Sequence, residues 1–244
     1  MQRLRLSVIA CPSMQPELEM LAAESGTAVS LRVLEMGLHE KSAAALHQAL
    51  QQAIDTATDC DAVVLAYGLC NRGVLGLVAR AVPVAIPRAH DCIGMLLGSS
   101  RRYLGELEAQ PGTYFQSAGW LNAAHLRQPD FTFGPNSNIT RERLAERYGE
   151  EEAQYLMEEI ARFARHYQRL AYIATPVADA AEREREAQAL AEKQQWRYQR
   201  LEGDLGWLRR LLAGGWNEEA FLVLQPGQRV VAASDERLIA AEPV

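Results

Sequence analysis

Short apolar runs alternate with segments of helical periodicity along most of this chain. The run at residues 62–69 contains no charged residue, and strands of this kind are typical of parallel sheets that helices cover on both faces. In residues 42–57, before that run, Leu46, Leu50 and Ile54 recur at helical spacing, which predicts an amphipathic helix. The alternation predicts an α/β fold with one or more Rossmann-like parallel sheets and helices on both faces.

Other segments of the chain show the same two patterns. Strands are predicted at residues 4–10, 29–34, 82–86, 112–116, 170–174, 196–201, 220–224 and 229–233. Helices are predicted at residues 15–24, 72–80, 91–107, 180–195 and 205–212, with one or two more at 144–167, broken near Gly149. Two prolines and several turn formers predict a long loop at residues 126–138.

The order of these elements predicts three parts of the chain. Residues 1–125 are expected to form an N-terminal α/β lobe, residues 126–168 a helical connection, and residues 169–244 a C-terminal α/β part that packs on the first. The pattern leaves two arrangements open: two lobes with a cleft between them, or a single sheet.

Composition disfavours several classes of partner. The formal net charge is −6, whereas proteins that bind nucleic acid non-specifically are usually basic, so no nucleic-acid partner is predicted. No apolar run approaches the roughly 18 residues that span a bilayer, and no signal peptide is visible. We therefore expect a cytoplasmic protein with no membrane partner. Its surface is compatible with a homodimer.

Three of the four cysteines fall where apolar strands are predicted to end. Cys11, Cys70 and Cys92 each follow such a run, and His90 lies two residues before Cys92. In an open α/β sheet, ligands bind outside the carboxyl ends of the strands, so these side chains are predicted to meet. Cys60 precedes its strand and is therefore expected at the opposite end of the sheet.

These residue types predict a metal site. Thiolates and imidazole bind zinc, iron–sulfur clusters and other transition metals, and disulfides are rare in the cytoplasm. We therefore predict that Cys11, Cys70, His90 and Cys92 bind a transition metal. The imidazole of His90 slightly favours zinc, whereas three thiolates alone suit a 4Fe–4S cluster with one open iron. The alternative is that the cysteines are core residues, since free cysteine is often buried.

Candidate catalytic groups lie beside these cysteines. His90 is predicted to act as a fourth ligand or a proton-transfer group. Asp91 is either a catalytic group or a cap for the following helix. Arg72 is the third catalytic candidate, and a guanidinium at this place would orient a small anionic substrate or cofactor.

Three further residues are predicted to bind the substrate. Arg88 and Asn71 carry donors for an anionic group. Tyr114 belongs to the predicted strand at residues 112–116, and its aromatic ring is a candidate wall of a pocket. The alternatives are a simple strand-to-helix turn at Asn71 and Arg72, and core packing for Tyr114.

Several motifs resemble those of one family of bacterial and archaeal proteins. They are Tyr67-Gly68-Leu69-Cys70, Pro87-Arg88-Ala89-His90-Asp91-Cys92, Pro111-Gly112-Thr113-Tyr114-Phe115 and Gly119-Trp120. In these motifs the chain is similar to the domain-of-unknown-function family sixteen-thirty-eight. The resemblance implies an association with corrinoid and methyl-transfer systems, and hence a partner protein from a corrinoid system.

Three functions follow as hypotheses. The first is a metal-dependent enzyme, a transferase or lyase, in one-carbon or methyl-group (corrinoid-linked) metabolism. The second is a metal or cofactor chaperone or insertion protein that uses the same ligands. The third is a non-catalytic small-molecule-binding module whose cysteines are core residues.

Overall fold

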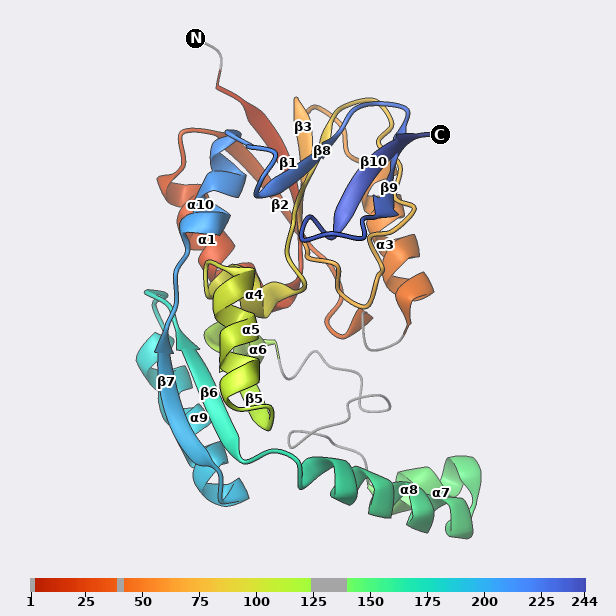
Figure 1. Ribbon diagram of the computed structural model, residues 1–244, viewed down its shortest axis with the longest axis vertical. Coiled ribbons are helices and arrows are strands. Elements are labelled where there is room, and N and C mark those ends of the chain that lie inside the picture. Colours follow the sequence, from red (N-terminus) through yellow and green to blue (C-terminus); the bar gives the residue numbers. More distant parts are fainter. Residues whose placement is uncertain (1–2, 39–41, 124–139) are drawn as a thin grey trace.

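The larger of the two main sheets contains five strands and is mostly parallel. The computed structural model describes residues 3–38, 42–123 and 140–244 (Figure 1). The strand order is β2-β1-β3-β4-β8, in which neighbours among the first four are parallel and β8 is antiparallel to β4. These strands are β1 (Arg5–Ala10), β2 (Ala28–Val33), β3 (Ala62–Ala66), β4 (Val84–Pro87) and β8 (Phe221–Leu224).

A second sheet contains three strands, all parallel, in the order β5-β6-β7. They are β5 (Thr113–Ser117), β6 (Arg169–Ala174) and β7 (Arg197–Glu202). An antiparallel pair, β9 (Gln228–Ala232) and β10 (Ile239–Pro243), follows β8. The predicted α/β class with Rossmann-like parallel sheets is confirmed, and the strands form two lobes.

Helices cover both sheets. On the larger sheet, α1 (Gln15–Glu24) and α10 (Gly206–Ala213) contact each other and the strands β2 and β3, and α3 (Ala43–Asp55) adds its buried leucines to the same core (Figure 1). We refer to this assembly as the first lobe; it also contains η1 (Pro12–Met14) and α4 (Cys92–Leu96). Ser42 caps α3 by accepting a hydrogen bond from the Ala45 N–H, which is why this helix begins where the sequence predicts.

The second lobe consists of the three-stranded sheet with α5 (Ser100–Ala109) on one face and α9 (Ala180–Gln194) on the other. Tyr103 of α5 packs edge-on against Phe115 of β5, while α9 contacts β6 and β7. The lobe also includes α6 (Ala118–Asn122), and α7 (Arg141–Tyr148) packs against α8 (Glu150–Ala164) before β6. Gly149 separates α7 from α8 with a φ of 92°, as the predicted helix break requires.

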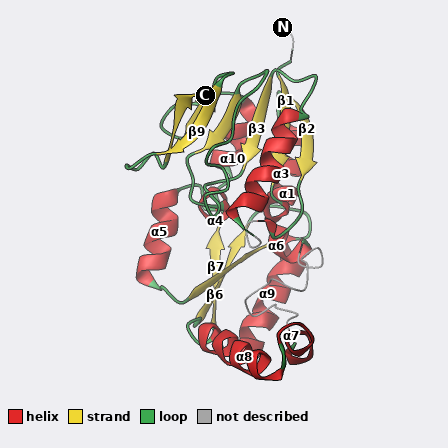
Figure 2. Ribbon diagram, turned by 90° about the vertical axis from the view of Figure 1, so that its right-hand side faces the viewer, coloured by secondary structure: helices red, strands yellow, loops and turns green. Residues whose placement is uncertain are grey.

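The carboxyl ends of the two parallel sheets face each other (Figure 2). Each strand of the second sheet is followed at once by a contact with the first lobe. The hydroxyl of Ser117, the last residue of β5, donates to the Ser13 carbonyl over 3.5 Å. Thr175, after β6, donates to Glu17 of α1 over 2.6 Å. Ligand sites are therefore expected between the sheets.

The predicted helix 91–107 is two helices, α4 and α5. Gly98 between them has a φ of 74°, and a Cβ there would lie 2.6 Å from the Asp204 side chain. Asp204, after β7, also donates its N–H to the Leu96 carbonyl over 2.9 Å. The chain breaks here because this tertiary contact requires a glycine, which the local periodicity does not reveal. The helix predicted at residues 72–80 is also wrong: turns and a single bridge from Val78 to Arg229 replace it.

The sheets do not follow the predicted division of the chain. β5 lies within residues 1–125 but pairs with β6 in the second sheet, and β8 lies within residues 169–244 but pairs with β4 in the first. The division into three domains stays a prediction. The predicted loop at residues 126–138 lies outside the described residues. In the described ranges, every helix is too short or too polar to cross a bilayer.

Candidate functional site

A cavity of about 230 Å³ lies at the carboxyl ends of β1, β3 and β4. We call it the cysteine cavity. Six of the residues predicted for the site line it: Cys11, Cys70, Asn71, His90, Asp91 and Cys92. Its remaining walls are Met14, Ala66, Tyr67, Ile93, Met95 and Trp120. The structure thus brings together the four predicted metal ligands, which come from three separate strand ends.

The two loops that carry most of these residues are joined through their backbones. The N–H of Leu69 donates to the Ala89 carbonyl over 2.8 Å, and the N–H of Cys70 donates to the His90 carbonyl over 2.9 Å. A Cβ on Gly68 would lie 2.7 Å from both the Ala89 oxygen and the Asp91 nitrogen. Such a distance is too short for a carbon atom, so only glycine allows this close approach.

The chain leaves the cavity through a left-handed turn. Cys70, Asn71 and Arg72 have φ values of 39°, 53° and 64°, and the N–H of Gly73 closes the turn on the Cys70 carbonyl over 3.2 Å. Left-handed φ is uncommon for residues other than glycine, and consecutive examples store strain. The turn leaves Arg72 exposed and outside the cavity walls, so the cavity lining does not include it and its catalytic role stays a prediction.

The thiols in the cavity resist ionisation. Burial is the largest cause that raises the pKa of the Cys70 thiol well above its ordinary value, followed by the neighbouring Cys11 and Asp91. Burial also raises the pKa of Cys92, and Cys11, Asp91 and Cys70 add to the effect. Among the described residues no lysine or arginine lines the cavity. These cysteines are therefore protonated at neutral pH and are poor nucleophiles as they stand.

Ser13 and Tyr67 contact the sulfur atoms, although neither was among the predicted site residues. The buried Ser13 hydroxyl donates to Cys11 Sγ over 3.1 Å and also interacts with the Cys92 thiol. The Tyr67 hydroxyl donates to the Ala10 carbonyl over 3.3 Å, and burial together with the three cysteines raises the pKa of this phenol. The signal for Tyr67 was its place in the motif before Cys70; nothing local marked Ser13.

Asp91 caps the helix α4. Its Oδ1 accepts hydrogen bonds from the N–H groups of Ile93 (2.9 Å) and Gly94 (3.2 Å), which is one of the two predicted roles. The carboxyl also lines the cavity, and burial raises its pKa, although hydrogen bonds from Gly94 and Tyr103 oppose this. Asp91 thus fixes the start of the helix that carries Cys92.

Removal of this cap has a predictable cost. Asp91→Ala leaves two N–H groups without their acceptor, so we expect a loss of about 1–2 kcal/mol in the free energy of unfolding. Asp91→Asn keeps the acceptor oxygen and should lose less than half as much. Urea denaturation of both variants measures the difference, and equal losses would show that the cap does not stabilise the fold.

Two predicted substrate-binding residues lie elsewhere. Arg88 donates to the backbone carbonyls of Glu218 (2.8 Å), Arg237 (3.1 Å) and Ile239, so its guanidinium ties the end of β4 to the segment before β10. Tyr114 packs against the rings of Tyr167 and Trp196 in the second lobe, at 5.4 and 5.7 Å. Their substrate-binding roles stay predictions; in the structure, long-range pairing that the sequence does not show holds both side chains.

The four predicted metal ligands line the same cavity, but their side chains do not surround one common point at which a metal ion would be bound. The four cysteines all lie in the described part of the chain and form no disulfide, and Cys60 precedes β3, away from the cavity. Across the described residues, no three His, Cys, Asp or Glu side chains stand in a group that could hold a metal ion. A metal would therefore require rotation of these side chains within the cavity.

Comparisons with known proteins identify the family of the chain. No curated protein and no solved structure matches the chain. One family model matches residues 33–212, a range that includes Cys70, His90 and Cys92. This range covers well over half of the chain and confirms the family resemblance, while Cys11 lies outside it. The chain belongs to the family described as "Protein of unknown function (DUF1638)".

Proposed function

We propose that the protein is a metal-dependent enzyme whose metal is bound in the cysteine cavity. Cys11, Cys70 and Cys92 are the proposed ligands, with His90 as a fourth ligand or as the group that moves a proton. The observation that supports this is the convergence of three thiols from three strand ends on one cavity that no described lysine or arginine lines. Three thiols without a disulfide are a donor set for zinc or an iron–sulfur cluster.

The electrostatics of the cavity favour a cation over a cysteine nucleophile. The raised pKa values of Cys70 and Cys92 keep these thiols neutral, and a divalent cation would supply the missing positive charge and displace their protons. The hydroxyls of Ser13 and Tyr67 lie where groups that orient metal ligands are expected. When bound, zinc would supply Lewis acidity or lower the pKa of a bound water or thiol.

The substrate must be small or must enter the cavity with only one end. About 230 Å³ lies below the usual range for sites that enclose a whole drug-sized molecule. Asn71 is the predicted substrate-binding residue that remains at the cavity. Within this proposal the reaction class stays the one-carbon or methyl-group chemistry that the sequence resemblance implies, by a transferase or lyase.

Metal analysis of the full chain, purified without oxygen, tests the proposal. We expect about one zinc ion or one cluster per chain, lost in Cys70→Ser and kept in Cys60→Ser, which changes a thiol outside the cavity. A brown protein with visible absorption would indicate a cluster, and a colourless protein with bound zinc would indicate zinc. Retention of the metal by Cys70→Ser, or no metal uptake by the native chain, would overturn the proposal.

A metal-transfer protein is a second candidate. The observation that favours it is that no three ligands in the described ranges are already grouped, because sites that assemble only on binding exchange their metal more easily. Loss of zinc to a chelator within seconds would favour transfer. Loss over hours would favour a resident cofactor.

A further inference from the structure

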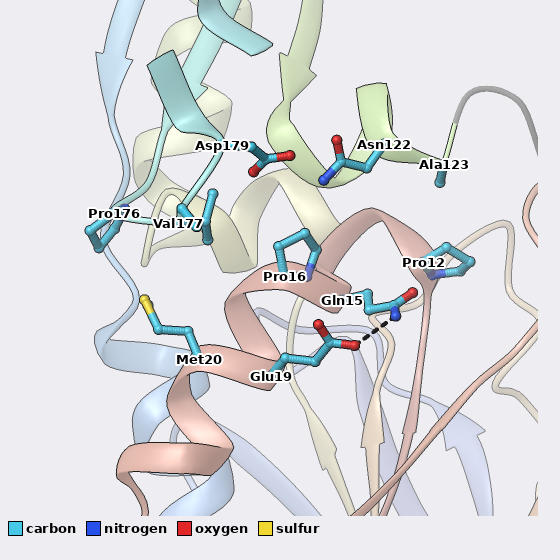
Figure 3. A pocket seen from close by; sticks show the side chains of 11 residues that line it. Pro12, Gln15, Pro16, Glu19, Met20, Asn122, Ala123, Pro176, Val177 and Asp179 are labelled. Carbon is cyan, nitrogen blue, oxygen red and sulfur yellow. Dashed lines mark hydrogen bonds between the residues drawn. The ribbon is translucent and has the colours of Figure 1, made fainter. Parts of the chain in front are cut away.

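A second and larger cavity opens between the two lobes. Its volume is about 670 Å³, and we call it the inter-lobe cavity. Its walls are the start of the first lobe's α1, the end of α6 and the connection from β6 to α9 (Figure 3). It lies beside the cysteine cavity, because η1 and α6 line both. Met14 and Trp120 line the cysteine cavity, whereas Pro12 and Asn122 line the inter-lobe cavity.

The position of this cavity is that of a ligand site. Pro12 follows the carboxyl end of β1, α6 follows that of β5, and Pro176 lies two residues beyond the end of β6. Ligands of α/β proteins bind at these ends of the strands, and the volume is within the range of small-molecule sites. None of the residues that line it belongs to the proposed metal site, so a ligand bound here would be separate from the metal.

The lining is apolar on several sides and acidic at two points. Met20, Val177 and three prolines supply apolar surface, and the two amides are Gln15 and Asn122. The charged groups are Glu19 and Asp179, while no Lys, Arg or His of the described residues lines the cavity. Figure 3 shows Asp179 and Asn122 turned toward each other across one end, with Glu19 and Gln15 near the other.

Each carboxylate keeps capacity for a further donor. Glu19 accepts a hydrogen bond from Gln15 Nε2 over 2.7 Å, and Asp179 accepts one from Arg183 Nε over 3.3 Å. The first bond lies within α1, and the second is an ion pair between Asp179, the residue before α9, and Arg183 of that helix. A carboxylate has about four acceptor sites, so both can also accept from a ligand.

A third acidic group lies behind the wall. Glu17 is fully buried between the lobes, Thr175 donates to its Oε1, and its Oε2 has no hydrogen-bond partner among the described residues. Burial is the largest cause that raises the pKa of Glu17, and the charge of Asp179 adds to it, which means that the two carboxyls interact electrostatically. A positive ligand beside Asp179 would relieve this repulsion, whereas a negative one would increase it.

We propose that the inter-lobe cavity binds a small organic cation, a protonated amine that carries an apolar group. The ammonium lies between Asp179 and Asn122, and the apolar group packs on the prolines, Met20 and Val177. The cation is bound at the lobe interface whether or not the cysteine cavity holds a metal.

Binding of matched probes to the full chain tests the charge preference. We use phenethylamine as the cation, 2-phenylethanol as its neutral analogue and 3-phenylpropionate as the anion, with affinity measured by calorimetry or ligand-observed NMR. Phenethylamine should bind with a Kd of about 1 mM or below, at least about tenfold tighter than 2-phenylethanol, and 3-phenylpropionate should not bind. Equal affinities for all three probes, or no binding of the amine, would overturn the proposal.

Charge-removing variants and methionine signals place the ligand. Asp179→Asn should weaken phenethylamine binding about tenfold and Glu19→Gln should weaken it less, whereas Glu192→Gln, an exposed acid of α9 outside the cavity, should have no effect. The methyl resonance of Met20 should shift on binding more than those of Met14 and Met95, which line the cysteine cavity. A larger shift at Met14 and Met95, or equal effects of Asp179→Asn and Glu192→Gln on the affinity, would contradict the proposed binding of the amine in the inter-lobe cavity.

The outcome is independent of the proposed metal site. Cys70→Ser should leave the affinity for phenethylamine unchanged, because Cys70 does not line the inter-lobe cavity. Failure of the amine to bind would therefore leave the metal proposal standing. Conversely, a Cys70→Ser variant that loses the metal but still binds phenethylamine would show that amine binding does not depend on the metal site.

Discussion

Gly68→Ala is expected to lower the free energy of unfolding by about 2–3 kcal/mol and to open the cysteine cavity. The added methyl group would lie 2.7 Å from two backbone atoms, the Ala89 oxygen and the Asp91 nitrogen. Backbone on both sides cannot rotate away as a side chain can, so the loops that carry Cys70 and Cys92 must separate. Urea denaturation measures the loss of stability, and the rate of native-state alkylation of Cys70 should rise with it.

Gly105→Ala is the matched control. Gly105 lies within α5, and no atom lies within 4 Å of a Cβ built there. Alanine in a helix is more stable than glycine by about 0.5–1 kcal/mol, so this variant should be more stable than the native chain and alkylate at the native rate. If Gly68→Ala were as stable as the native chain, the close approach of the two loops would be refuted.

Glu17→Gln is expected to make stability less dependent on pH. Burial is the largest cause that raises the pKa of Glu17, and Asp179 adds to it, while the hydrogen bond from Thr175 opposes it. A carboxyl whose pKa is raised on folding contributes its stability below its unfolded pKa of about 4.3, and this is lost as pH rises through the folded pKa. Each unit of the increase is worth about 1.4 kcal/mol.

The variant should therefore gain stability over the native chain between about pH 4 and neutrality. Thermal unfolding at several pH values measures this, with the difference in Tm growing as pH rises. Glu19→Gln is the control, since Glu19 is exposed two residues further along the same helix. A difference in Tm that stays constant over the pH range would mean that ionisation of Glu17 does not lower the stability of the folded state.

Local patterns predicted the strands that carry the site. Cys11, Cys70 and Cys92 could be placed at one sheet edge because each follows an apolar run, and parallel strands bring their ends together. Asp91 as a helix cap was equally local, since it precedes the first turn of its helix. The contacts of the Asp91 cap are short-range in sequence, and the convergence of the three cysteines follows from strand direction alone.

Residues held by long-range pairing could not be placed in this way. Arg88 looked like a ligand for an anion, but its partners are backbone carbonyls 130 to 151 residues further along the chain. Tyr114 looked like a pocket residue, but β5 pairs with β6 in the second sheet and carries it away. Ser13 was missed because no local pattern marks a serine two residues after Cys11 as its partner, and its interaction with Cys92 comes from a distant loop.

The contact between Gly98 and Asp204 is one of several that hold the two lobes together. The described chain passes between the lobes at residues 97–99 and again at residues 203–205, and these two connections touch through the Asp204 N–H and the Leu96 carbonyl. The lobes also share one hydrophobic core, to which Ile173 and Leu201 of the second sheet contribute. A change in the angle between the lobes would have to break this packing and the hydrogen bonds from Ser117 to Ser13 and from Thr175 to Glu17. Cys11, Cys70 and Cys92 all belong to the first lobe, so their mutual positions do not depend on that angle.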